Sequence, residues 1–209
     1  MTFQHQREYW QRQCRILGRH VRYAHAAWSE SGRRARAEAL ATLYRQVNAW
    51  LREAGVDYWI CYGTLLGWSR EQRILPHDRD VDFAAPINAY AALKAEESKL
   101  PPGFTLYDTS HRHGGPKLYV CYRGWDADIY FLVEHENTLR TIENSPNPGD
   151  TAPFPRDWFY PACTVDFLGA QTRVPAEPQR YLEHTYGYTG PDAELDPVTR
   201  YYRPVKRRG

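Results

Sequence analysis

Apolar residues return at helical spacing at the start of the chain. Two stripes follow residues 3–28, and at 3.6 residues per turn they lie roughly 150° apart around the helix axis. The apolar stripe holds Trp10, Cys14, Leu17 and Val21, and the basic stripe holds Arg12, Arg15, Arg19 and Arg22. The pattern predicts a basic amphipathic helix with its apolar stripe on the core and its arginines in solvent. The alternative is an arginine face that meets an anionic surface or substrate.

Other segments have the periodicity or the end signals of helices. After a break at residues 29–32, apolar residues at helical spacing predict a second helix over 33–54, with Gly55 placed to end it. Pro86 is placed to open a third helix that runs to about residue 100. The remaining predicted helices are short: 65–70 and 178–186.

Strand-like segments bounded by Gly and Pro dominate the later part of the chain. Helices first and strands later, with some alternation, predict a mixed α/β or α+β fold. A length of 209 residues favours one domain with an appendage. The predicted strands are 58–62, 81–84, 104–107, 117–122, 127–133, 164–168 and 171–174.

The composition is that of a globular protein without a membrane span. Mean hydropathy is −0.71, and because no window approaches 18 apolar residues, no transmembrane helix is predicted. The first residues lack the apolar run of a secretory signal. The four cysteines form no Cys-x-x-Cys pair, which favours a reducing compartment. We therefore expect a cytoplasmic protein.

Charge is unevenly distributed along the chain. Residues 1–36 hold eight Arg and two Glu, residues 200–209 hold five basic groups and no acid, and because the total is +2, the remainder carries −9. This distribution differs from that of a uniformly basic nucleic-acid binder, so nucleic acid is not the expected partner. The basic ends can instead bring the protein to an anionic, lipid-linked substrate at a membrane surface. The expected divisions are a basic N-terminal helix over 1–32, a catalytic domain over 33–190 and a basic tail over 191–209.

Aspartates alternate with apolar residues on the predicted strand around residue 81. Asp80 and Asp82 leave one face of this strand, while Val81 and Phe83 leave the other. Two carboxylates side by side repel each other unless a cation neutralises them. Ligand sets made only of oxygen suit Mg²⁺ or Mn²⁺. The pair therefore predicts one half of a metal site.

The same alternation returns on the strand around residue 128. Asp126, Asp128 and Tyr130 leave one face, and the residues between them are apolar. One Asp-x-Asp is weak evidence, but two on otherwise apolar strands are much stronger. If the two strands are neighbours, three or four carboxylates converge on one metal site.

A strand-to-helix turn at Gly63 and Thr64 precedes the first aspartate pair. Glycine allows close backbone approach, and the N-terminus of the following helix offers free N–H groups to a diphosphate. Arg70, one to two turns further on, can add a charge-assisted contact. An ordinary structural turn is the alternative interpretation of Gly63.

The order of these motifs resembles the signature of the LicD family, which includes bacterial phosphocholine transferases and the fukutin and fukutin-related ribitol-phosphate transferases. The resemblance extends from about residue 40 to 190. His77 stands where the family usually has Trp, and Arg79 where Asp is common. The matching segments are Tyr62-Gly63-Thr64-Leu65-Leu66-Gly67-Trp68-Ser69-Arg70, Ile74-Leu75-Pro76-His77-Asp78-Arg79-Asp80-Val81-Asp82, Asp128-Ile129-Tyr130-Phe131-Leu132, Phe159-Tyr160-Pro161, Val174-Pro175 and Tyr181-Leu182-x-x-x-Tyr186-Gly187.

The resemblance implies a nucleotidyltransferase-type fold, with a mixed sheet flanked by helices. It also implies transfer of a phospho-alcohol from a CDP-linked donor to a hydroxyl, usually on a glycan, with release of CMP. Carried over to this chain, Asp80, Asp82 and Asp128 are the catalytic and metal-binding carboxylates. Asp128 or Asp78 would accept the proton of the acceptor hydroxyl. Asp78 and Asp126 are accessory candidates.

Two basic residues complete the candidate site. His77 beside the aspartates would bind phosphate or shape the donor pocket, or it is an ordinary surface-loop histidine. Lys117 opens an apolar strand and loosely resembles a lysine of the family; a donor-phosphate contact and a solvated strand end are equally compatible with the sequence. The donor site is therefore predicted at Gly63, Thr64, Arg70, His77 and Lys117.

Two other functions use the same residues differently. A nucleotidylyltransferase would take CTP or ATP and transfer the nucleotide itself with the same carboxylates. An inactive binding module would recognise an anionic ligand with its basic ends. The intact set of clustered aspartates favours an enzyme, because uncompensated buried charges are costly.

Overall fold

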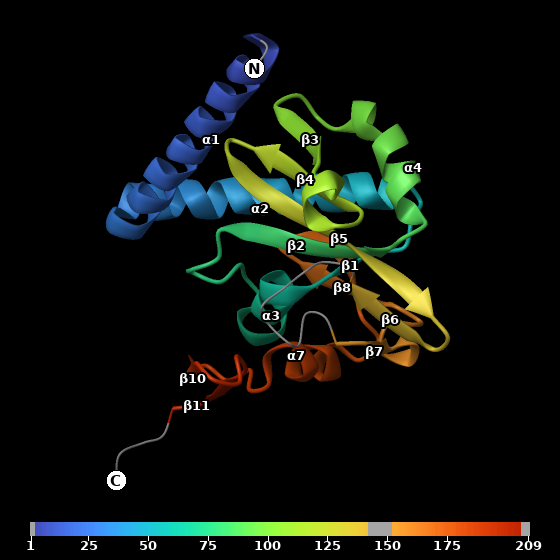
Figure 1. The fold of residues 1–209 in the computed structure, drawn as a ribbon. Helices are drawn as coiled ribbons and strands as arrows, with labels where there is room; N and C mark the ends of the chain where they lie inside the picture. The colour runs from blue at the N-terminus through green and yellow to red at the C-terminus, as the bar shows by residue number, and fades with distance from the viewer. Residues whose placement is uncertain (1–2, 142–151, 206–209) are drawn as a thin grey trace.

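The computed structural model describes residues 3–141 and 152–205 (Figure 1). The helices are α1 Phe3–Trp28, α2 Glu30–Glu53, α3 Tyr62–Glu71, α4 Ala89–Ala95, α5 Ser110–His113 and α7 Pro178–Tyr186, with 3₁₀ turns at Glu97–Lys99 and Arg156–Trp158. The strands are β1 Trp59–Ile60, β2 Asp80–Pro86, β3 Phe104–Asp108, β4 Lys117–Tyr122, β5 Trp125–His135, β6 Thr138–Thr141, β7 Phe154–Pro155, β8 Cys163–Phe167, β9 Ala170–Val174, β10 Ala193–Leu195 and β11 Tyr202–Pro204. Among the described residues, no helix combines the length and the apolar character that a membrane crossing requires.

The central sheet has the strand order β1-β2-β5-β4-β3, and β6 and β7 extend it from β5. Strand β2 pairs with β5 in parallel, whereas the other neighbours are antiparallel. The pairing sets Asp80 opposite Asp126 and Asp82 opposite Asp128. The prediction of a mixed α/β fold is confirmed, and the two aspartate strands are direct neighbours.

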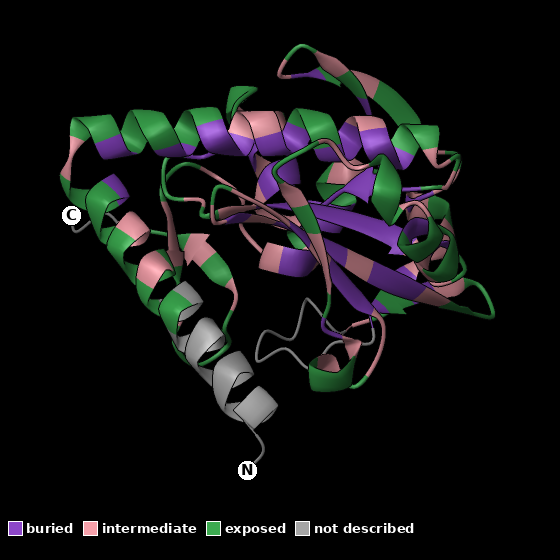
Figure 2. Cartoon of the chain, turned by 90° about the horizontal axis from the view of Figure 1, so that it is seen from above, coloured by how far each residue is buried: buried purple, intermediate pink, exposed green. Residues whose placement is uncertain are grey.

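Helix α2 covers the apolar face of the sheet. Its stripe of Leu40, Leu43 and Val47 is fully buried, and Tyr44 stacks on Phe83 of β2 with ring centroids 6.0 Å apart. Figure 2 shows the buried side of this helix turned toward the buried strands. Burial of this one-sided stripe drives the packing, and it leaves the opposite face of the sheet for polar residues.

Helix α2 begins three residues earlier than predicted. The Ser29 hydroxyl accepts a hydrogen bond from the Gly32 backbone N–H at 2.9 Å, so Ser29 caps the helix and the break is confined to it. A Cβ on Gly32 would lie 2.2 Å from the carbonyl oxygen of His25. Glycine therefore allows α1 and α2 to approach closely at their junction.

The orientation predicted for α1 is wrong. Leu17 and Val21 of the apolar stripe are 65% and 61% exposed. The basic side faces the protein: Arg19 pairs with Asp126 at 2.5 Å, and Arg22 donates to the carbonyl oxygen of Gly124 at 3.1 Å. Specific partners on the β4–β5 turn and at the start of β5 thus outweigh the burial of the apolar stripe. The side chains predicted at Trp10, Arg12 and Arg15 lie outside the described residues.

Several element bounds also differ from the prediction. Pro86 ends β2 instead of opening a helix, and α3 begins at Tyr62, so the Gly63-Thr64 turn forms its first turn. The expected tail over 191–209 contains the β10–β11 hairpin. Strands β6 and β7 were not predicted, because their few residues show little alternation.

Candidate active site

Three carboxylates meet on the polar face of the sheet. Strands β2 and β5 present Asp80, Asp82 and Asp128 from the same side, and one oxygen of each lies within 4.8 Å of the others. Asp82 is 7% exposed. The residues between them, Val81 and Ala127, are fully buried on the opposite face. Strand alternation and parallel register together build the cluster that the sequence predicts.

Burial and mutual repulsion disfavour the charged forms of Asp80 and Asp82. The pKa of Asp80 is raised to about 6, first by burial and then by the charges of Asp128, Asp78 and Asp126. Burial, followed by Asp80 and Asp128, raises the pKa of Asp82 well above its usual value. An all-oxygen donor set under this repulsion fits a hard divalent cation such as Mg²⁺ or Mn²⁺.

Lys117 supplies a positive charge beside these carboxylates. It is 3% exposed, and its Nζ lies 3.8 Å from Asp128 Oδ1 and 3.1 Å from the centroid of the Tyr130 ring. The interpretation of Lys117 as a solvated strand end is therefore wrong. Its contact with a donor phosphate stays a prediction.

A hydrogen-bonded loop holds the start of β4 in place. The hydroxyl of Ser110 accepts from the Lys117 backbone N–H at 3.1 Å and donates to Asp108 at 2.5 Å. Asp108 also accepts from Tyr90 and Lys94, each at 2.6 Å. These bonds hold the pKa of the Asp108 carboxyl well below its usual value, although burial opposes them. The network fixes the backbone from which Lys117 reaches the carboxylates.

Thr64 and Gly63 hold the chain around the cluster in place. The Thr64 hydroxyl is buried and accepts a hydrogen bond from the Asp82 backbone N–H at 2.8 Å. A Cβ on Gly63 would lie 3.2 Å from Asp78 Oδ1, so the glycine lets this carboxylate pack on the first turn of α3. Their roles in donor binding stay predictions, and the structure adds a structural role to each.

The loop before β2 rests on an arginine that sequence reasoning missed. Arg36 of α2 is 7% exposed and donates to the carbonyl oxygens of Leu75 and Asp78, at 3.2 and 2.5 Å. Gly67 also fits this loop, because a Cβ there would lie 2.4 Å from the Arg73 carbonyl oxygen. The one available signal was a basic residue close to the apolar stripe of α2.

The other predicted site residues lie around the three-carboxylate cluster, and some of them have other partners. Asp78 is 13% exposed, and burial raises its pKa. The His77 side chain is 79% exposed, with Nε2 3.9 Å from Asp78 Oδ1. Arg70 lies in the last turn of α3, about 10 Å along the helix axis from Gly63. Asp126 lies beside Asp80 but pairs with Arg19.

Helix α1 packs beside the strands that carry the carboxylates. Tyr23 contacts Trp125 with ring centroids 5.3 Å apart, and the Arg79 guanidinium lies 4.8 Å from the centroid of the Tyr23 ring. Together with the Arg19–Asp126 pair, these contacts place α1 beside the N-terminal ends of β2 and β5. Sequence periodicity singled out Arg19, but its partner is 107 residues away along the chain.

Two tyrosines extend the polar face toward the edge of the sheet. Tyr107 and Tyr119 stack with ring centroids 4.8 Å apart and an interplanar angle of 15°. Tyr119 lies opposite Asp128 in the β4–β5 register. Burial and the charge of Asp126 raise the pKa of Tyr119. This flat aromatic surface, which sequence reasoning missed, is one strand away from the carboxylates.

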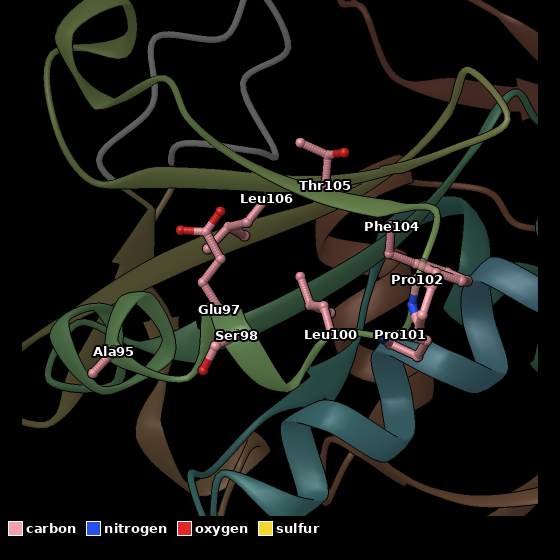
Figure 3. Close-up of a pocket in the computed structure, with 9 residues that line it drawn as sticks. All are labelled: Ala95, Glu97, Ser98, Leu100, Pro101, Pro102, Phe104, Thr105 and Leu106. Carbon is pink, nitrogen blue, oxygen red and sulfur yellow. The ribbon is translucent and has the colours of Figure 1, made fainter.

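A separate open groove of about 620 Å³ lies along the β3 edge of the sheet (Figure 3). Leu100, Pro101, Pro102, Phe104 and Leu106 are among its lining residues. The carboxylates of β2 and β5 are not part of its lining. The candidate active site is therefore the polar face of the sheet and not this groove.

The pKa shifts predict how a divalent cation stabilises the protein. The pKa of Asp80 in the folded protein, about 6, exceeds its usual value of 3.8, so metal-free stability should fall as pH rises from about 4 through 6. A divalent cation binds the charged carboxylates, so the rise in melting temperature with Mn²⁺ should grow over the same range. Thermal unfolding with Mn²⁺ and with EDTA, at pH 5 and at pH 7.5, measures it. An equal rise at both values would contradict this prediction.

The fold and site together define a class. An Asp-x-Asp strand beside a strand that supplies a third aspartate, with a glycine turn packed against them, is the arrangement of a nucleotidyltransferase-type domain. Residues 55–177 match the family described as LicD/FKTN/FKRP, nucleotidyltransferase domain. The chain belongs to the LicD family.

Two curated relatives show the same likeness. The chain is 28% identical over 149 residues to the human ribitol-5-phosphate transferase FKTN. This match covers 66% of this chain and 30% of that protein. It is 24% identical over 163 residues to the mouse ribitol 5-phosphate transferase FKRP, covering 71% and 31%. The chain thus spans about a third of the length of these relatives.

Two solved structures show a partial likeness to the chain. The solution structure of ANT(2'')-Ia has a TM-score of 0.46 at 16% identity, covering 68% of this chain and 69% of that one. The lincomycin-bound adenylyltransferase LnuA has a TM-score of 0.45 at 14% identity, covering 76% and 90%.

Proposed function

We propose that this protein is a metal-dependent phosphotransferase. It moves a phospho-alcohol, such as phosphocholine or a polyol phosphate, from a CDP-linked donor to a hydroxyl on a glycan or a small metabolite. The observation that carries the proposal is the convergence of Asp80, Asp82 and Asp128 on one face of the sheet. Family membership and the ribitol-5-phosphate transferases among the relatives support it.

The carboxylates would hold Mg²⁺ or Mn²⁺, which neutralises charge on the donor diphosphate and on the leaving CMP. The acceptor oxygen forms a bond to the transferred phosphorus, and the bond from that phosphorus to the CMP oxygen breaks. Asp128 or Asp78 takes the proton of the acceptor hydroxyl on a carboxylate oxygen. Lys117 holds a positive charge at the Asp128 side of the site.

The flanking elements support a site that binds an anionic donor. Gly63, Thr64 and Arg70 on α3 and His77 in the following loop are the proposed donor contacts. The stacked Tyr107 and Tyr119 provide a flat surface at the other side of the carboxylates. A cytoplasmic location, with a lipid-linked acceptor reached at the membrane surface, is part of the proposal.

A ligand panel tests the proposal directly. Melting temperature and turnover are measured with CDP-choline, CDP-ribitol, CDP-glycerol, CTP and ATP, each with Mg²⁺ and with EDTA. We expect a rise in melting temperature with CDP-alcohols that requires the metal, and CMP release when the acceptor is present. The variant Asp80→Asn should lose both responses. Asp166→Asn, an equal change at an exposed position of β8, is the matched control and should keep them.

The same panel separates the alternatives. A metal-dependent rise mainly with CTP or ATP, with release of pyrophosphate, would replace the proposal by a nucleotidylyltransferase. Binding that is lost with salt but unaffected by EDTA would indicate an anionic-ligand module without catalysis.

A further inference from the structure

The outer face of α1 carries apolar side chains that the described part of the chain does not cover. Leu17 is 65% exposed, Val21 61% and Trp28 88%. Cys14 and Ala24 on the same side are exposed as well. Soluble surfaces carry isolated apolar residues without consequence, but five along one helix face form a continuous stripe.

The spacing of this stripe is that of a coiled-coil seam. Successive positions alternate by four and three residues over α1, which is about 39 Å long at 1.5 Å per residue. A buried stripe in a globular protein is usually broader, with additional apolar positions on one side. The seam positions are Trp10, Cys14, Leu17, Val21, Ala24 and Trp28.

The opposite face of α1 is the one that docks on the protein. At 100° per residue, Tyr23 lies about 200° around the axis from Val21. Ala26 is buried, Arg19 pairs with Asp126 of β5, and Arg22 donates to Gly124 in the β4–β5 turn. The packing of residues 3–141 and 152–205 therefore leaves the seam open to another molecule.

We propose that α1 pairs with α1 of a second copy of this chain through the seam. The positions that flank a coiled-coil seam decide whether two copies repel each other. Here these positions carry no Arg, Lys, Asp or Glu, so two identical helices meet without like charges. They are Gln11, Gln13, Gly18, His20, His25 and Ala27.

The same charge distribution disfavours a lipid surface as the occupant. A helix that lies on an anionic membrane places Lys or Arg beside its apolar stripe. The described arginines of α1 that bond, Arg19 and Arg22, lie on the docked face instead, and Arg19 is paired with Asp126. A second copy of the seam is therefore the better match.

Symmetry supports pairing of the seam with itself. In an antiparallel pair centred on residue 19, Leu17 meets Val21 and Cys14 meets Ala24, so every seam position faces another. A parallel pair sets each residue against its own copy. Either arrangement holds α1 from its outer side, next to the Arg19–Asp126 contact of the candidate active site.

The mass of the protein in solution tests the proposal. Light scattering from about 1 to 200 µM should show the 24.4 kDa chain approaching twice its mass as concentration rises. The double variant Leu17→Glu, Val21→Glu should keep the single-chain mass throughout, with unchanged helix content and melting temperature at low concentration. Ala35→Glu, Ala37→Glu adds the same charge at exposed positions of α2 and should dimerise like the wild type.

Oxidative cross-linking gives a second readout in a Cys163→Ser background. A disulfide between the two copies of Cys14 supports the parallel pair. A disulfide between Cys14 and the thiol introduced by Ala24→Cys supports the antiparallel one. A single-chain mass at all concentrations without either cross-link would overturn the proposal. A monomer that binds phosphatidylglycerol vesicles, and loses that binding with Leu17→Glu, Val21→Glu, would replace it by a membrane surface.

Discussion

Replacing Asp80 by Asn should abolish turnover while raising the melting temperature of the metal-free protein. The pKa of Asp80 is raised to about 6, so at pH 8 folding forces a charge into a place that disfavours it. Removing that charge should stabilise the metal-free fold by up to about 3 kcal/mol. This is the free energy that corresponds to a pKa of about 6 instead of 3.8. The same change removes a ligand oxygen from the cluster and should lower turnover about 10³-fold or more.

The measurement compares thermal unfolding of both proteins at pH 8 in EDTA and in Mn²⁺. The variant should be the more stable in EDTA, and the wild type should gain more from Mn²⁺. At pH 5 the advantage in EDTA should shrink, because the wild-type carboxyl is then largely protonated. Asp166→Asn should show neither effect. A variant that is less stable in EDTA at pH 8 would contradict the repulsion argument, and near wild-type turnover would remove Asp80 from the metal site.

The sequence predicted the faces of the two aspartate strands but not how the strands meet. Alternation assigns Asp80 and Asp82 to one face and Val81 to the other, because successive side chains of a strand point to opposite sides. That β5 lies directly beside β2, in parallel and with Asp82 opposite Asp128, depends on contacts between distant segments. The resemblance to a known family supplied Asp128 as the third aspartate, but not the pairing or the register of the two strands.

Helix periodicity has a similar limit. It gives the angle between the apolar and basic stripes of α1 but not which stripe meets the protein. The apolar character of Leu17 and Val21 alone would predict that they are buried. The arginine side docks because Asp126 at the start of β5 and the Gly124 carbonyl on the β4–β5 turn bind it, and both lie more than a hundred residues further along the chain.

Residues that support the site were missed for the same reason. Arg36 bonds to two loop carbonyls about forty residues away, and the Thr64 hydroxyl bonds to the backbone of Asp82. Neither partner is visible in the local sequence. Lys117 was found, but its burial against Tyr130 was not, because the first position of a strand is often exposed.

Replacing Lys117 by Met should destabilise the metal-free protein at neutral pH and above. Its ammonium group is the buried positive charge beside Asp128, and it lowers the pKa values of Asp80 and Asp82. Removing one partner of a buried ion pair lowers the free energy of unfolding by about 3–5 kcal/mol. The loss should be largest at pH 8 in EDTA. It should shrink at pH 5, where Asp80 is largely protonated, and with Mn²⁺, which replaces the missing charge.

Lys99→Met makes the same change at an exposed lysine and should leave stability nearly unchanged at every pH, because an exposed ion pair contributes little. Unfolding curves for both variants and the wild type, at pH 5 and pH 8, with and without Mn²⁺, measure the effect. A loss of stability in Lys117→Met that is equal under all four conditions would indicate lost packing rather than lost charge. Turnover with saturating Mn²⁺ then separates the two roles of Lys117: an unchanged KM for the donor assigns it to balancing the carboxylates, and a raised KM assigns it to the donor phosphate.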